Sequence, residues 1–160
     1  MGWNSLGYIR QGVNSFTPVL AVEQGAGTPV GIGLGNYGTY EVHNGLCTAH
    51  WSINLDSTMM MVIPLYTGEF IMPLPVNPVN YETFLMAGSW WIERFWGGGG
   101  FGNLEITRQF NGGAPYVKML INRYHDDPIA ILRCPDAKDY YLWSDSSIKC
   151  SIQYPVETIS

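Results

Sequence analysis

The side chains most suited to recognition chemistry form an aromatic segment in the second half of the chain. Residues 90 to 96 read Trp-Trp-Ile-Glu-Arg-Phe-Trp, and an aromatic ring follows after the four glycines at 97 to 100. Such rings bury large apolar areas and can pack in a core, anchor a subunit contact or stack on a sugar. The candidate residues for a subunit contact or a ligand platform are Trp90, Trp91, Phe95, Trp96 and Phe101.

The faces of this segment follow from strand geometry. In a strand, alternate side chains point to opposite faces, so Trp90 and Ile92 would share one face and Trp91 and Phe95 the other. Both faces then carry a large aromatic side chain. One face can pack into the core, and the other needs cover from a loop, a neighbouring subunit or a ligand.

Hydrolytic chemistry has little support in the residue pattern. An activated serine or cysteine needs a histidine base and an orienting acid, yet no segment around His43, His50 or His125 has the pattern of a nucleophile elbow or a cysteine-protease signature. Glycan cleavage needs two carboxyl groups, and Glu93 with Glu105 is the pair left open. We predict no catalytic residues, with a glycan-cleaving enzyme as an alternative.

Two further motifs resemble ligand sites only superficially. The glycines between Gly31 and Gly35 suggest a phosphate loop, but such a loop needs a helix directly after it, and a strand-like run beginning at Tyr37 follows instead. The sequence His-Asp-Asp-Pro at 125 to 128 is typical of a turn, with no second histidine at metal-ligand spacing. We therefore predict no cofactor and no metal.

Composition narrows the class of partner. The net charge is −5 and the eight basic residues are scattered, so we predict no nucleic-acid binding. No apolar run approaches the roughly 18 residues of a membrane span, and the N-terminus does not read as a signal peptide. Charged residues make up 13% of the chain, about half of the roughly 25% usual for soluble domains, which indicates a surface partly covered by other protein.

The three cysteines fit a protein made in a reducing cytoplasm. Cys47, Cys134 and Cys150 are odd in number, widely spaced and without a Cys-x-x-Cys pair. This pattern is neither a disulfide framework nor a zinc site, and it favours buried small side chains.

The elements that must position these residues are predicted to be strands. Glycine and proline, 19 and 10 in number, cut the chain into pieces too short for stable helices, and apolar and polar residues alternate between the breaks. Asn44-Gly45 predicts a two-residue hairpin turn, and the prolines from 73 to 78 predict a rigid crossover. The predicted strands are 16–22, 37–43, 47–55, 59–64, 70–74, 89–96, 104–110, 116–124, 129–133 and 148–154.

This pattern predicts an all-β fold, an antiparallel β-sandwich of jelly-roll type formed by residues 15–160 as a single domain. Residues 1–14 are predicted to be an N-terminal docking arm, because apolar side chains alternate there with glycines too irregularly to fold alone. The arm residues expected to fill pockets on a partner are Trp3, Leu6, Tyr8 and Ile9. The open alternative is that residues 1–14 form the first edge strand of the domain.

Several segments together resemble the β-sandwich head domains of tailed-phage tail-fibre and minor tail proteins. The resemblance spans most of the chain. It is carried by Phe16 to Leu20, by Gly38 to Gly45 after a glycine-rich loop, by Trp51-Ser52-Ile53, by Leu74-Pro75, and by Trp143-Ser144-Asp145 with the last strand ending at Tyr154. These motifs are loose and the family has no fixed catalytic residues. The chain departs from the family in having neither the heptads nor the Gly-x-y repeat of a fibre shaft.

The resemblance implies a trimeric virion component at the particle surface, assembled in the host cytoplasm. Low charge and abundant aromatic residues also favour a homotrimer, since closed symmetry buries apolar patches. The expected partners are copies of the chain itself, other tail or capsid proteins and a host cell-surface glycan. Because the chain lacks a shaft, a capsid decoration protein is the main alternative to a tail-tip or tail-fibre module.

Overall fold

The computed structural model describes residues 13–23, 30–35, 37–56, 58–59, 69–79, 85–93, 100–108, 115–121, 130–131 and 147–157. In this part of the chain the fold is all-β, and every strand pair is antiparallel. The strands are β1 (Val13–Phe16), β2 (Val19–Glu23), β3 (Val30–Leu34), β4 (Tyr37–His43), β5 (Leu46–Asn54), β6 (Glu69–Pro73), β7 (Leu85–Glu93), β8 (Gly100–Arg108), β9 (Pro115–Ile121), β10 (Ala130–Ile131) and β11 (Ser147–Pro155).

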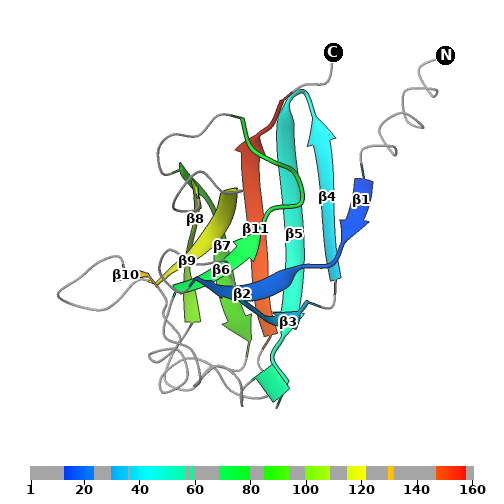
Figure 1. Ribbon diagram of the computed structural model, residues 1–160. Coiled ribbons are helices and arrows are strands. Elements are labelled where there is room, and N and C mark those ends of the chain that lie inside the picture. Colours follow the sequence, from blue (N-terminus) through cyan, green and yellow to red (C-terminus); the bar gives the residue numbers. More distant parts are fainter. Residues whose placement is uncertain are drawn as a thin grey trace.

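The strands form one curled sheet with the order β1-β4-β5-β11-β7-β8-β9-β6-β2-β3, and β10 pairs with β9. The curl brings β2 and β6 across β5 and β11, as Figure 1 shows. The Trp51 indole on β5 donates a hydrogen bond to the Met72 sulfur on β6 at 3.2 Å, which joins the two layers across the interior. The inner face of the sheet is therefore closed over a core.

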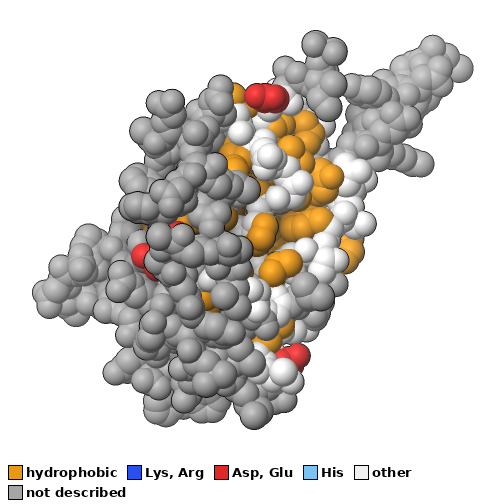
Figure 2. All heavy atoms as spheres, viewed as in Figure 1, with side chains coloured by type: hydrophobic (Ala, Val, Ile, Leu, Met, Phe, Trp, Pro, Cys, Tyr) orange, Lys and Arg blue, Asp and Glu red, His pale blue; other side chains and the backbone are white. Residues whose placement is uncertain are grey.

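One hydrophobic cluster fills this interior. It takes alternate residues from seven strands, so each strand contributes one apolar face, as the period-two pattern requires. The members from the strands are Leu20, Val22, Cys47, Ala49, Trp51, Ile53, Phe70, Met72, Trp90, Ile92, Leu104, Ile106, Val117, Met119, Ile148, Cys150, Ile152 and Tyr154. The visible surface of the described residues carries orange hydrophobic and white uncharged side chains and few acidic ones (Figure 2).

The predicted crossover after β6 lies against the end of β11. Pro78 forms a bridge with Val156, and the Val79 amide donates to the Pro155 carbonyl at 3.1 Å. The Tyr154 hydroxyl donates to the Val76 carbonyl at 2.8 Å, and Leu74 and Val76 pack on the core. The proline-rich segment thus runs from one layer to the other.

The hairpin turn at Asn44-Gly45 and two of the cysteines are as predicted. Asn44 and Gly45, between β4 and β5, both have positive φ, at 49° and 74°, as a type I′ hairpin turn requires. Cys47 and Cys150 are buried and free. Burial raises the pKa of both thiols, although a hydrogen bond with Tyr154 partly opposes this for Cys47. Neither thiol is a reactive nucleophile in this environment.

Two strand assignments need correction. The segment predicted as one strand from Phe16 to Val22 breaks at Thr17-Pro18 into β1 and β2, because proline lacks the amide hydrogen that a ladder needs. The glycine-rich run at 30–34 is the strand β3 and not a loop. A Cβ at Gly33 would lie 2.0 Å from the Met59 methyl group, so this strand uses glycine to leave room for Met59.

Several other predictions concern residues that lie partly or wholly outside the described part of the chain. Val13 and Asn14, the end of the predicted arm, pair with β4 as part of β1, while Trp3, Leu6, Tyr8 and Ile9 lie outside the described residues. Cys134, the predicted turn at 125–128 and residues 60–64 of the predicted strand at 59–64 also lie outside them, and Met59, the described residue of that strand, is helical instead. Within the described part, no helix is long and apolar enough to cross a membrane.

Candidate functional site

The outer face of the sheet, opposite the core, carries two regular rows of side chains where β8, β7, β11, β5 and β4 lie side by side. Cross-strand partners define the first row, called here the aromatic row, which runs Phe101, Trp91, Lys149, Ser52 and Tyr37. Trp91 is 43%, Phe101 56% and Tyr37 64% exposed. Directly paired residues have Cβ atoms about 5 Å apart, so Trp91 and Phe101 are an exposed cross-strand pair of aromatic residues.

The second row lies two residues along each strand and is built from small polar side chains. This polar row runs Asn103, Ser89, Ser151, His50 and Thr39. Because a strand rises about 3.4 Å per residue, the two rows are about 7 Å apart. Hydrogen-bonding side chains therefore lie alongside the aromatic pair on the same face.

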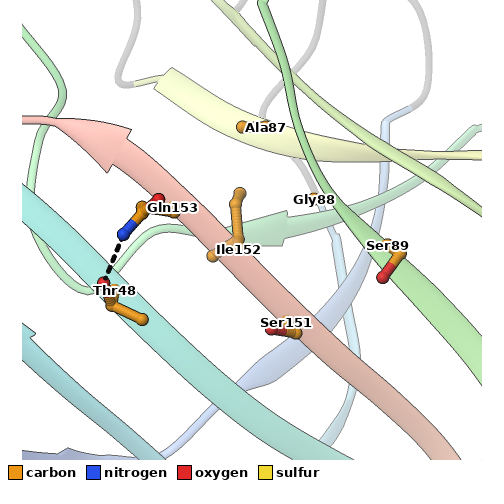
Figure 3. Close-up of a pocket in the computed structure, with 7 residues that line it drawn as sticks. All are labelled: Thr48, Ala87, Gly88, Ser89, Ser151, Ile152 and Gln153. Atoms are coloured by element: carbon orange, nitrogen blue, oxygen red, sulfur yellow. Dashed lines mark hydrogen bonds between the residues drawn. The ribbon is translucent and has the colours of Figure 1, made fainter.

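A shallow hollow of about 310 Å³ opens at the polar row, between β7 and β11. Figure 3 shows its lining, with Thr48 on β5, Ser151 and Gln153 on β11, and Ser89 on β7. The Gln153 amide nitrogen donates to the Thr48 hydroxyl at 3.1 Å. The hollow thus offers hydroxyl and amide groups from three neighbouring strands.

A bulge in β7 produces this hollow. Met86 pairs with Glu105 and Gly88 with Leu104, so Ala87 is an extra residue with no partner of its own on β8. The β7–β11 ladder ends at Gly88 paired with Ile152. A Cβ at Gly88 would lie 2.0 Å from the Ser151 carbonyl oxygen, so only glycine permits this close approach. Bulges of this kind bend a strand and re-aim its side chains.

The two neighbouring tryptophans have opposite placements. Trp90 points inward, is 1% exposed, and donates from its indole nitrogen to the Leu120 carbonyl at 2.8 Å. The Trp90 indole packs against Gly102 on β8, because a Cβ at that position would lie only 2.7 Å from the indole nitrogen. The opposite placements of Trp90 and Trp91 confirm the predicted split of this segment between two faces.

The outer face differs at the other end of the sheet, on β9, β6 and β2. Ile71, Tyr116 and Ala21 point away from the core and are buried there as a second small cluster. The Lys118 ammonium lies 2.6 Å from a carboxylate oxygen of Glu69 and 3.8 Å from one of Glu23. We call this the closed end of the outer face, and the region of the two rows the open end.

Ionisation at the closed end follows from burial and neighbouring charge. The Tyr116 hydroxyl donates to Glu23 at 2.5 Å. Burial, this hydrogen bond and the charges of Glu23 and Glu69 raise the Tyr116 pKa. Burial also raises the pKa of Glu105, and repulsion from Glu69 adds to this, whereas attraction to Lys118 opposes it. The carboxylates here are bound to protein groups and do not form an open site.

The structure does not assemble the carboxylate pair considered for glycan cleavage. Glu105 lies opposite Met86, and Glu93 lies at the far end of β7 opposite Ser147. The strand rise separates them by on the order of 20 Å, well beyond the roughly 5–10 Å of a catalytic pair. Among the described residues, no group of three or more histidine, cysteine, aspartate or glutamate side chains is arranged to hold a metal.

The five aromatic residues predicted as a subunit contact or ligand platform do not all lie at one site. Trp91 and Phe101 come together at the open end, Trp90 belongs to the core, and Phe95 and Trp96 lie outside the described residues. Sequence reasoning missed the polar partners Ser89, Ser151, Gln153, Thr48 and Tyr37 as members of one surface. The period-two alternation predicts that these side chains point outward. It does not predict the order of the strands in the sheet, and that order is what brings the side chains close together.

Comparisons of the chain with protein-family models, with curated protein sequences and with solved structures found no match.

Proposed function

We propose that the chain is a non-enzymatic structural protein of a tailed-phage virion, an exposed tail-tip or tail-fibre module that contributes to assembly and host attachment. The observation that carries this proposal is the exposed Trp91–Phe101 pair beside an uncharged polar row. Recognition surfaces combine aromatic anchors with a polar surround, and the anchors supply most of the binding energy. The sequence resemblance to tail-fibre head domains supports the same assignment.

The proposal includes a finer description of the fold and assembly. The layers β3-β2-β6-β9 and β4-β5-β11-β7 act as the two sheets of a jelly-roll β-sandwich, supported by the Trp51–Met72 contact across the interior. The chain assembles as a homotrimer through β1, which ends the strand order and exposes Val13. Edge strands offer backbone groups for pairing with another chain. Light scattering on the purified protein should give about three times 17.9 kDa, and a monomer at micromolar concentration would contradict the trimer.

Immuno-gold labelling of whole virions tests the proposed location. Antibodies raised against the purified chain should label the tail tip or fibres. Label over the whole head would instead favour a capsid decoration protein, and label on no particle would overturn any virion role. The same antibodies should block adsorption if the chain carries an attachment surface.

A further inference from the structure

We infer that the open end of the outer face is a binding site for a neutral glycan of at least two sugar rings. This inference rests on the proposed function and deepens it by naming the ligand class. It comes from three features that meet at one place, namely the Trp91–Phe101 pair, the hollow at the β7 bulge and the low charge of the two rows.

The aromatic pair suits the apolar face of a sugar. A pyranose ring presents a flat array of C–H groups on one side, and this side stacks on aromatic rings while the hydroxyl groups stay at the ring edge. Trp91 and Phe101 lie on directly paired strands, so the ladder fixes the positions of their backbones. A fixed aromatic platform binds without ordering a loop, which lowers the entropic cost of binding.

The hollow suits the hydroxyl groups of the next ring. Sugar hydroxyls both donate and accept hydrogen bonds, and serine, threonine and glutamine side chains can do the same. Ser89 and Ser151 supply such groups about 7 Å along the strands from the aromatic row, and Gln153 and Thr48 supply them about 14 Å along. A volume of about 310 Å³ is at the small end of ligand pockets, which fits one ring at a time.

The charges around the site favour a neutral ligand. Within the two rows, Lys149 is the only side chain that is charged at neutral pH with histidine neutral, and in the next row the exposed acidic residue Glu41 lies opposite Thr48 of the hollow. Recognition of carboxylated or sulfated sugars uses clustered arginine and lysine, which pair with anionic groups. The uncharged polar row therefore selects hexoses and N-acetylhexosamines over acidic sugars.

The test uses the purified full chain on a printed panel of neutral oligosaccharides of hexoses and N-acetylhexosamines, with sialylated and sulfated counterparts. Wild type should bind a neutral glycan, with tryptophan fluorescence changing on titration. Trp91→Ala should weaken that binding at least tenfold, and Ser151→Val should weaken it through the hollow. Val42→Ala is the control, because Val42 is an exposed apolar residue of β4 that lies opposite the core residue Cys47, on the other side of the sheet from the two rows, and it should leave binding unchanged.

The outcomes separate this inference from the proposed function. Absence of binding to every neutral glycan, binding of acidic glycans alone, or binding that survives Trp91→Ala would overturn the glycan site. Loss of self-association in Trp91→Ala without any glycan binding would assign the aromatic pair to a subunit contact instead. Virion labelling involves no glycan, so the proposed function can stand or fall by itself.

Discussion

At the closed end of the outer face, Ile71 and Tyr116 are buried and Lys118 lies between two glutamates. At the open end, Trp91 and Phe101 are exposed, with Lys149 opposite Trp91 and a row of uncharged polar side chains alongside. Both ends belong to the same side of one continuous sheet. The closed end is thus held by apolar packing and paired charges, whereas at the open end two large aromatic side chains stay exposed beside a row of small polar residues.

This contrast separates side chains that hold the fold from side chains that recognise a partner. A buried apolar residue or a paired charge contributes to the free energy of unfolding, and its removal is costly. An exposed aromatic residue contributes little to folding and much to an interface. Substitutions at the closed end should therefore lower the free energy of unfolding and leave binding nearly unchanged. Substitutions at the open end should weaken binding and leave the free energy of unfolding nearly unchanged.

The largest effect on stability is expected from Ile71→Ala at the closed end. Ile71 is 1% exposed, and removing such a side chain from a packed site costs about 2–5 kcal/mol. Urea unfolding followed by circular dichroism measures this cost, while glycan or cell binding by the folded fraction should be unchanged. A cost below about 1 kcal/mol would show that the closed end is not tightly packed.

A smaller loss is expected from Lys118→Met. This change leaves Glu69 and Glu23 close together without the ammonium group between them, at side-chain exposures of 20% and 10%. We expect a cost of about 1–2 kcal/mol, between the values for surface and buried ion pairs. Adding Glu69→Gln should recover part of the loss in a double-mutant cycle, and simple additivity would contradict the pairing.

The expected effect of Glu105→Gln has the opposite sign. Burial, with repulsion from Glu69, raises the pKa of Glu105 in the folded chain above its ordinary value of 4.5, so the ionised carboxylate disfavours folding at neutral pH. Glu105→Gln should therefore be slightly more stable than wild type at pH 7. The difference should disappear as the pH falls below about 4.5, where the carboxyl is protonated in both states. Denaturant midpoints measured from pH 4 to pH 8 check this, and lower stability of the variant at pH 7 would contradict it.

The smallest effect on stability is expected from Trp91→Ala. Its side chain is 43% exposed, so the free energy of unfolding should stay within about 0.5 kcal/mol of wild type. Thermal melts of the two proteins should nearly coincide. A large fall in melting temperature would show that Trp91 belongs to the fold and would remove the contrast between the two ends.

The sequence predicted which side chains of a strand point inward or outward better than it predicted which strands lie next to each other. Alternation placed Trp90 inward and Trp91 outward, and Asn44-Gly45 marked its turn, because both depend on local geometry. Strand order depends on distant pairs such as Ile152 with Ala49 and with Gly88, which local patterns do not specify. The hollow depends on the bulge at Ala87, so the polar half of the candidate site could not be predicted.

The most direct test of the attachment role compares cell binding by two folded proteins. Fluorescently labelled wild type and the double variant Trp91→Ala/Phe101→Ala would be incubated with host cells and measured by flow cytometry. The account predicts that wild type stains the cells and that the variant, with an unchanged melting temperature, loses at least tenfold of that signal. Equal staining by both proteins, or no staining by wild type, would contradict attachment through the open end.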